Sequence, residues 1–502
     1  MQATSLETES NSDQRRMIIR EFGFNTSTHG IPGIARSQSL HNRIFWSISF
    51  VGFFGIMSFF VTQAILAYYS YPTQTLVRFA NQWPQPFPAV TICNYSPFRY
   101  DQFIGSYLNY TNTFNLTNTT NTDRIAFTQQ QASYIYSYLQ YKLNRNESVN
   151  QIFFSLSSML IKCIYNGKNC SSDDFVTFQS PTYGRCYTFN AQTSAINNGS
   201  IHYNNENGQS GKLHLDLYIH SHQYVPFISD ATSIVAMVHD NTQLPLIDRL
   251  GVELVAGRKH KIAYSTTTNT FLPSPYTTCT EKNNLGMQAM FDQFSGANYS
   301  YGQQICFQVA NQIYTYEQCG CVSPLQWPTR YIVPLGTSNV IFANLCNVSD
   351  PCYSAAATRF RNSSSVTGEY AKDCESECFT NDFPIQISSS SAPQQWYVND
   401  IKQFVEISSI PLPANWSTTW LTEIRSNYVG LDVVCGSTQV ESYTQQATLG
   451  AVDVISNIGG QTGLWIGISF LSLMEFAEML YRLLRYQFLN VLEKVCRKNV
   501  KN

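Results

Sequence analysis

The apolar stretch from Ile455 to Leu484 constrains the fold of this chain more than any other, because its composition suits a membrane. About 20 largely apolar residues span the hydrocarbon core of a bilayer, and Gly463 to Leu484 supplies that length. Gly459, Gly463 and Gly467 recur every four residues, so one face of a helix would carry no side chains and another backbone could approach it closely. We therefore expect a transmembrane helix at this position.

Two acidic residues inside this stretch, Glu475 and Glu478, lie three positions apart and therefore on one helix face. Carboxylates inside a membrane are costly unless they face water or a partner. One interpretation is a packed helix whose glutamates turn toward neighbouring protein. The other is a pore in which several copies converge at a turn formed by Gly467, Ile468 and Ser469, above rings of carboxylates that attract cations. The stretch alone leaves both interpretations open.

A second apolar run, from Ile44 to Tyr69, contains no charged residue and predicts another span. The residues before it are polar and include five arginines, so we expect no cleavable signal peptide. Residues 1–21 are expected to be disordered. Further basic residues lie at and after the end of the last apolar run, and basic flanks favour the cytoplasmic side. We therefore expect both termini in the cytoplasm and the residues between the spans outside the cell.

The predicted organisation has five parts. They are a cytoplasmic segment over residues 1–43, a first span over 44–69, an extracellular domain over 70–457, a second span over 458–484 and a cytoplasmic tail over 485–502.

Cysteines and glycosylation sequons support this topology. Thirteen of the fourteen cysteines lie between the spans, which indicates an oxidising compartment and disulfide bonds. A metal interpretation of Cys319-x-Cys321 and Cys374-x3-Cys378 lacks the spacing of zinc sites, so disulfides are favoured. The same region carries eleven Asn-x-Ser/Thr sequons, which we predict to be glycosylated. They are Asn94, Asn109, Asn115, Asn118, Asn146, Asn169, Asn198, Asn298, Asn347, Asn362 and Asn415.

Charge and motif content exclude several classes of function. Charged residues make up 13% of the chain, against about 25% in typical soluble domains. The formal net charge is −2, so nothing indicates a nucleic-acid partner. No G-x-S-x-G, HExxH or paired metal motif is present outside the membrane stretches. We expect neither an enzyme nor a bound cofactor or metal.

The extracellular part shows strand patterns. The sequence FPAVTICN, from Phe87 to Asn94, predicts a strand that begins after a proline and ends at a cysteine. Alternating apolar residues over 213–219 and 233–239 predict two more strands. His239 ends the last of these and is expected to be structural. The Asn-, Thr- and Tyr-rich segment over residues 98–184 is expected to form a solvated helical lobe.

These motifs together resemble the degenerin/epithelial sodium channel/acid-sensing ion channel family. SNIGGQTGLWIGIS followed by E-x-x-E is similar to that family's second membrane segment, and FPAVTICN is similar to its post-membrane signature. The resemblance implies a membrane protein with two transmembrane helices and a large disulfide-rich α+β extracellular domain, built from a palm β-sheet and a helical finger and thumb. It also implies a plasma-membrane homotrimer, or a heterotrimer with related subunits.

The resemblance assigns the pore. Gly467, Ile468 and Ser469 match the family's selectivity filter, with sodium as the permeant ion. Glu475 and Glu478 would form the acidic ring of the pore.

The resemblance also assigns gating residues. His29 and Gly30 match a re-entrant loop under the pore, although composition alone would predict an ordinary Gly/Pro turn there. A catalytic or metal role for His29 is not expected, because no second ligand is nearby. Ser456 matches the position at which bulk hinders closing. Tyr71 and Tyr276 match an aromatic pair that couples the thumb to the first span in the family. Relatives carry tryptophan at the position of Tyr276.

Cysteine spacing alone does not fix which cysteines are bonded to each other. The family resemblance proposes six disulfides, which would stiffen the thumb and its surroundings. Each bond would contribute about 2–4 kcal/mol to the free energy of unfolding. Cys435 is left without a partner. The proposed bonds join Cys93 with Cys186, Cys163 with Cys170, Cys279 with Cys378, Cys306 with Cys374, Cys319 with Cys352, and Cys321 with Cys346.

The expected function is a sodium-selective, amiloride-sensitive channel. Acid-sensing relatives carry histidine after the aromatic above the first span, whereas Pro72 and Thr73 stand there in this chain. The thumb carries Arg359 and Arg361, with no acidic residue after Cys352 until Glu369. We therefore expect an extracellular ligand, a short neuropeptide as in the FMRFamide-gated invertebrate members, to open the channel. The alternatives are a proton-gated, mechanically gated or constitutive channel of the same family, or a non-conducting adhesion receptor.

Overall fold

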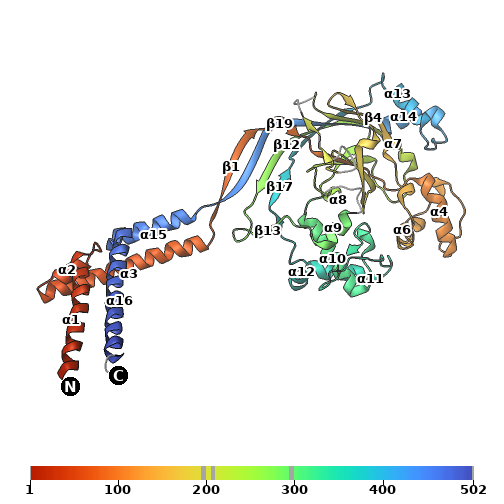
Figure 1. Ribbon diagram of the computed structural model, residues 1–502. Helices are drawn as coiled ribbons and strands as arrows, with labels where there is room; N and C mark the ends of the chain where they lie inside the picture. Colours follow the sequence, from red (N-terminus) through yellow and green to blue (C-terminus); the bar gives the residue numbers. More distant parts are fainter. Residues whose placement is uncertain (1, 194–198, 205–209, 293–298, 500–502) are drawn as a thin grey trace. The chain divides into compact units, whose positions relative to one another are not determined.

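The computed structural model describes residues 2–193, 199–204, 210–292 and 299–499 (Figure 1). The chain divides into two compact units. The first, which we call the helical unit, comprises Met1–Gln74 and Gln446–Asn502. The second, which we call the sheet unit, comprises Thr75–Gln445.

The helical unit contains the first predicted span. Helix α3 has a mean hydropathy of 2.0 over its most apolar window, and only 6% of that window is buried inside the chain. An apolar helix that its own chain leaves uncovered suits a lipid environment. The helices of this unit are α1 (Gln2–Asn25), α2 (Ile31–Arg36), α3 (Leu40–Tyr69), α15 (Ala451–Ile466) and α16 (Phe470–Asn499).

The second predicted span is not one continuous helix. Helices α15 and α16 are long and apolar enough to cross a membrane only when taken together, and they are bent by 74° at their junction. Gly467, Ile468 and Ser469 form that junction. The expectation of disorder over residues 1–21 is also wrong, because helix α1 begins at Gln2. That segment is polar but contains good helix formers and no glycine or proline before Gly23.

The sheet unit is built around two β-sheets. In the larger sheet the strands follow the order β17-β12-β19-β9-β4-β5, with β1 paired to β19 and β18 paired to β12. The long strands β12 and β19 run parallel. The bounds are β1 (Thr73–Asn81), β4 (Leu160–Tyr165), β5 (Lys168–Asn169), β9 (Leu213–Tyr218), β12 (Arg258–Thr270), β17 (Phe379–Asp382), β18 (Ile385–Ser391) and β19 (Tyr428–Ala447).

The second sheet has the order β11-β10-β3-β7-β6. Strand β3 is buried at every position, which explains why FPAVTICN shows a continuous run of apolar and small residues instead of alternation. All three strands predicted from sequence, β3, β9 and β10, are present. The bounds are β3 (Ala89–Asn94), β6 (Phe175–Ser180), β7 (Gly184–Phe189), β10 (Ser233–His239) and β11 (Val252–Val255).

The lobe predicted over residues 98–184 is helical only in its first half. Helices α4 (Tyr100–Thr113), α5 (Gln129–Ser133) and α6 (Ile135–Asn144) pack around a buried aromatic cluster that includes Phe103, Tyr107 and Tyr138. From Leu160 onward the chain forms β4 to β7, so the helical prediction is wrong there. Several of the tyrosines that suggested a solvated lobe, including Tyr100, Tyr107 and Tyr138, instead fill its core.

The remaining helices form a thumb and two peripheral helices. The thumb contains α9 (Leu285–Phe291), α10 (Gln303–Cys319), α11 (Pro351–Asn362) and α12 (Ser364–Tyr370); α13 (Val398–Ile407) and α14 (Trp416–Asn427) pack on each other. Short elements complete the unit: α7 (Leu156–Met159), α8 (Ile247–Leu250), and the paired strands β2 (Gln85–Pro86) with β8 (Tyr203–Asn204), β13 (Cys279–Thr280) with β16 (Ser376–Glu377), and β14 (Tyr331–Ile332) with β15 (Ile341–Phe342).

All six disulfides that the family resemblance implied are present. The metal interpretation of the paired cysteines is therefore wrong, because each of those sulfurs is bonded to another sulfur. Cys435 is a buried free thiol in β19. His239 is structural, as expected: its Nε2 lies 2.7 Å from the Thr91 hydroxyl and its Nδ1 lies 2.9 Å from the backbone oxygen of Asp240.

The predicted glycosylation sites differ in accessibility. Asn198 and Asn298 lie outside the described residues. Eight others are exposed: Asn109, Asn115, Asn118, Asn146, Asn169, Asn347, Asn362 and Asn415. Asn94 is only 2% exposed, and its amide nitrogen donates to the Ile219 backbone oxygen at 3.1 Å. The fold leaves no room for a glycan on this nitrogen, so the prediction for Asn94 is corrected.

This correction is testable with a matched pair of substitutions. Asn109→Gln should remove one glycan and increase electrophoretic mobility, and the difference should disappear after glycosidase treatment. Asn94→Gln should leave the glycan mass unchanged but lower the surface level, since an extra methylene in a packed site costs about 1–3 kcal/mol. A glycosidase-sensitive mobility change in Asn94→Gln would contradict the burial of this residue.

Candidate functional site

The junction between α15 and α16 joins the end of one helix to the start of another. Gly467 has a φ of +66°, a left-handed conformation that glycine adopts without steric cost and that ends helices. Its N–H donates to the Gly463 oxygen at 3.1 Å. Ser469 then accepts a hydrogen bond from the Ser472 N–H on its Oγ at 3.3 Å, as an N-cap of α16. The tripeptide predicted to be the selectivity filter therefore ends one helix and begins the next.

The loop at His29 and Gly30 lies against this junction. The N–H of His29 donates to the oxygen of Ile466, the last residue of α15, at 2.8 Å. A Cβ placed on Gly467 would lie only 2.6 Å from Cγ and Nδ1 of His29. The imidazole therefore occupies the place that a side chain at 467 would need. The family resemblance assigned these residues to a loop under the pore, and the structure brings them into contact with Ile466 and Gly467.

Two glycines allow the chain to turn back onto α3. Gly30 has a φ of +89°, and a Cβ there would lie 3.0 Å from the ring of Phe50. A Cβ on Gly33 would lie 2.6 Å from the ring of Trp46. Both positions therefore require the absence of a side chain, and they hold helix α2 and the His29 loop against the first span.

Glu475 is hydrogen-bonded to the N-terminal segment. Its Oε2 accepts from the Ser27 N–H at 2.8 Å and from the Ser27 hydroxyl at 3.3 Å. The Ser27 hydroxyl also lies 2.6 Å from the hydroxyl of Ser472, which is 4% exposed. The carboxylate therefore helps to fix the loop that carries His29. Ser27 and Ser472 were missed as site residues; the Ser-x-x-Ser spacing of 469 and 472 was the only available sequence signal.

The second glutamate of the predicted acidic ring also has a partner. Glu478 pairs with Arg482 at 3.1 Å, one turn further along α16, and Arg482 pairs in turn with Glu21 of α1 at 3.2 Å. This exposed chain of charges links α1 to α16. Its contribution to stability is small, because exposed ion pairs are screened by water. It orients Glu478 along the helix surface.

Aromatic stacking joins the two membrane segments above the junction. The ring of Trp465 stacks on Phe53 at 6.1 Å and on Phe60 at 6.0 Å between centroids. Its indole N–H donates to Gln461 one turn earlier at 2.8 Å. The last turn of α15 is thereby held on α3, which fixes the position at which the helix ends.

Several predicted residues are not brought together. Ser456 lies exposed on α15. Tyr71 belongs to the helical unit and Tyr276 to the sheet unit, so their coupling stays a prediction. In the described part of the chain, nothing lies within 4 Å of a Cβ placed on Gly459 or Gly463. The face of α15 that carries these two glycines is therefore not covered by other described residues of the same chain.

The chemistry available at the junction is that of uncharged oxygen. Ser469 is exposed where the helix is interrupted, and hydroxyl and carbonyl oxygens can replace the water around a small cation. Among the described residues, no group of three or more His, Cys, Asp or Glu side chains is arranged to hold a metal ion.

Comparisons with known proteins agree with this description. A family model described as amiloride-sensitive sodium channel matches residues 22–479, which include the His29 loop and the helix junction. The chain is 23% identical to epithelial sodium channel subunit gamma of Neoceratodus forsteri, over 91% of this chain and 80% of that protein. It is 24% identical to acid-sensing ion channel 1C of Danio rerio, over 97% and 88% of the two chains. It is also 24% identical to acid-sensing ion channel 1 of Gallus gallus, over 96% and 87%.

The contact between Gly467 and His29 predicts the effect of the smallest substitution. Gly467→Ala should abolish sodium current without abolishing surface expression. A left-handed alanine costs about 1–2 kcal/mol, and its methyl group would overlap the imidazole. Gly463→Ala is the matched control, because it adds the same methyl group to a regular helical position with no close neighbour in its own described chain. Voltage clamp normalised to surface protein measures both, and a normal current in Gly467→Ala would contradict the arrangement.

Proposed function

Because the chain belongs to the amiloride-sensitive sodium channel family, we propose that it is a subunit of a sodium-selective, amiloride-sensitive cation channel in the plasma membrane. One observation carries the proposal: an otherwise apolar span is interrupted at Gly467, Ile468 and Ser469, and an N-terminal loop occupies the interruption. Carbonyl and hydroxyl oxygens at the interruption would replace part of the hydration shell of sodium. Glu475 and Glu478 would raise the cation concentration beside it.

The proposal requires several copies of the chain, because a single bent span cannot enclose a pore. We propose a homotrimer, or a heterotrimer with related subunits, with both termini in the cytoplasm. The open face of Gly459 and Gly463 supports close packing between subunits, since no side chain there would hold a neighbouring helix away. Ser456 lies on the same helix, where bulk would hinder closing.

The alternative of a non-conducting adhesion receptor makes a different demand on the membrane segments. A receptor that needs only anchors would be served by two continuous apolar helices. It would not need a left-handed glycine under an imidazole, or a carboxylate that accepts two hydrogen bonds from a serine 448 positions away. These features favour conduction over anchoring.

The role of Glu475 can be separated from its packing by two substitutions. Glu475→Gln removes the charge but keeps an oxygen that can accept from the Ser27 N–H, whereas Glu475→Ala removes both. If the carboxylate concentrates cations, Glu475→Gln should lower single-channel sodium conductance about twofold or more at an unchanged surface level. Voltage clamp in a sodium gradient measures conductance and reversal potential. If only Glu475→Ala has an effect, Glu475 acts as a packing residue. No sodium current from any form of the chain would contradict the channel proposal itself.

We further propose that an extracellular peptide, and not mild acid, opens the channel. Burial disfavours the charged form of two histidines in the sheet unit, lowering the pKa of His220 to about 3 and that of His239 to about 4. Both are fully buried side chains with hydrogen-bond partners in the backbone. Neither gains a proton when the pH falls to about 6.

A third histidine has the opposite shift. Burial alone would lower the pKa of His214, but its hydrogen bonds to Asp216 at 3.2 Å and Asp432 at 2.5 Å outweigh burial and raise it. Asp432 is also contacted by Lys212 and Lys259, each at 3.1 Å. These partners outweigh burial of the carboxylate and hold the pKa of Asp432 below its usual range. Asp216 and Asp432 therefore each have a basic side chain within 3.2 Å.

The pH response follows from these shifts. A step from about pH 7.4 to about pH 6 should evoke no current, because the lowered pKa values of His220 and His239 keep both imidazoles neutral over that range. Stability should begin to fall as the pH drops below about 6.5, because the unfolded chain takes up protons there while folded His220 and His239 stay neutral down to their lowered pKa values. Voltage clamp during acid steps, and thermal unfolding of the full-length protein across this range, measure the two effects. A large transient current evoked by acid alone would contradict the proposal.

A further inference from the structure

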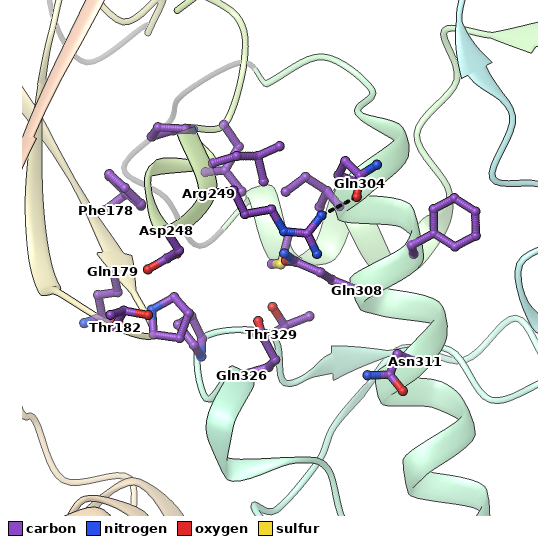
Figure 2. Close-up of a pocket in the computed structure, with 18 of the residues that line it drawn as sticks. Phe178, Gln179, Thr182, Asp248, Arg249, Gln304, Gln308, Asn311, Gln326 and Thr329 are labelled. Atoms are coloured by element: carbon purple, nitrogen blue, oxygen red, sulfur yellow. Dashed lines mark hydrogen bonds between the residues drawn. The ribbon is translucent and has the colours of Figure 1, made fainter. Parts of the chain in front are cut away.

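A cleft in the sheet unit lies between the thumb and the smaller β-sheet and has a volume of about 310 Å³ (Figure 2). One wall is formed by the end of β6, the turn that follows it, and α8. The other wall is formed by α10 and α11 of the thumb. This volume lies within the range of pockets that bind small ligands, and both walls come from well-packed elements. The cleft is separate from the helix junction, which belongs to the other unit.

The thumb wall of the cleft presents amides. Gln304, Gln308 and Asn311 lie four and three residues apart on α10 and therefore share one face of the helix. The Oδ1 atom of Asn311 is buried and has no hydrogen-bond partner in the described part of the chain. Buried polar atoms almost always have a partner. Because this oxygen is itself fully buried, a ligand in the cleft would meet the other amide groups of this helix face, those of Gln304 and Gln308.

The charges of the cleft are unequal. It is lined by two arginines, Arg249 of α8 and Arg361 of α11, and by one carboxylate, Asp248. Figure 2 shows the Arg249 side chain reaching from α8 toward α10, where it donates to the Gln304 side chain at 2.5 Å. Neither arginine forms an ion pair with any described carboxylate, and Asp248 accepts from the Ser180 hydroxyl at 2.7 Å. The guanidinium of Arg249 is thus oriented by a neutral amide and not by a carboxylate of the described residues.

The ordinary explanation for such residues is a solvated polar surface. It accounts for exposed glutamines and for an exposed arginine such as Arg359, which does not line the cleft. Arg249 and Arg361 are exposed as well, but both line the cleft. It does not account for an arginine held across a concave site by an uncharged partner. Apolar side chains, Phe178 and Phe360 among them, line the same cleft and supply contact area.

We propose that this cleft binds a short acidic peptide, with a ligand carboxylate on Arg249 and Arg361 and ligand backbone groups on the α10 amides. Guanidinium groups bind carboxylates through paired, charge-assisted hydrogen bonds. Side-chain amides both donate and accept, as peptide backbone recognition requires. This inference rests on the proposed peptide gating and specifies its ligand: a peptide with at least one Asp, Glu or free C-terminal carboxylate.

A ligand in the cleft would act on a stiff element. Cys306–Cys374 and Cys319–Cys352 hold both ends of α10, and the second of these bonds joins it to α11. Cys93–Cys186 joins β3 to β7 in the sheet that carries the other wall. Because each wall is internally cross-linked, a ligand held between them changes the spacing of two rigid bodies instead of deforming one. If the ligand binds more tightly at one spacing of the two walls than at another, it shifts the population of channels toward the spacing that it prefers.

The test compares two matched pools of C-terminally amidated tetrapeptides, with Asp at one position in the first pool and Asn at that position in the second. Full-length channel in lipid nanodiscs is incubated with each pool, and retained peptides are identified by mass spectrometry. The variants are Arg249→Gln and Arg361→Gln, with Arg359→Gln as a control on the same helix outside the cleft. We expect preferential retention from the Asp pool. Retention should fall about tenfold or more in the first two variants, as loss of a charge-assisted hydrogen bond predicts, and stay unchanged in the control.

The outcomes separate the two proposals. If peptides open the channel but Arg249→Gln and Arg361→Gln retain them like the unsubstituted protein, the cleft proposal is overturned and peptide gating stands. If no peptide opens the channel, peptide gating is overturned, and a tethered anion then tests the cleft. Gln308→Cys is modified with the anionic reagent 2-sulfonatoethyl methanethiosulfonate, and modification is verified by mass. We expect an altered sodium current that a neutral reagent of similar size does not produce; an unaltered current overturns the cleft proposal.

Discussion

The hydrogen bond from the His29 N–H to the Ile466 oxygen is the interaction on which the helical unit depends. A helix that stops inside a bilayer leaves carbonyl groups without partners, and lipid offers none. Irregular backbone at membrane depth is tolerated only where protein or a water-filled cavity receives it. The His29 loop supplies a donor at that point, and the left-handed Gly467 lets the imidazole approach. The interruption of the span and the return of the N-terminal segment therefore require each other.

The loop is in turn fixed by contacts that reach past the junction. Ser27 is held by Glu475 and Ser472 of α16, and the glycines at 30 and 33 lie against aromatic rings of α3. The loop is thus tied to the helix that follows the junction and to the helix of the other span. Its position cannot change without breaking hydrogen bonds on one side or ring contacts on the other. Such an element has a small number of discrete arrangements, as a gate requires.

The extent to which the sequence predicted this structure depends on the kind of interaction. The buried strand at FPAVTICN and the apolar helix α3 follow from local composition, and the disulfides follow from family resemblance because spacing alone leaves many pairings open. The end of α15 was hidden, because hydropathy counts apolar residues and is blind to the dihedral angles of Gly467. The Ser27–Glu475 contact joins residues 448 positions apart, and no local pattern indicates it. The burial of Asn94 was missed for the same reason, since its partners lie on other segments.

The two candidate sites also differ in how they can change. The junction works through backbone oxygens and through the absence of side chains at Gly467 and Gly30, so almost any substitution there damages it. The cleft works through the charges and amides of side chains carried on cross-linked elements, and a single Arg-to-Glu change would invert its preference without disturbing the helices beneath. Binding residues on a rigid scaffold vary more freely than the scaffold itself. A chain of this construction can keep one conduction chemistry while its stimulus changes. This is the physical reason why the permeant ion follows from family membership, whereas the ligand has to be inferred from the side chains of this particular cleft.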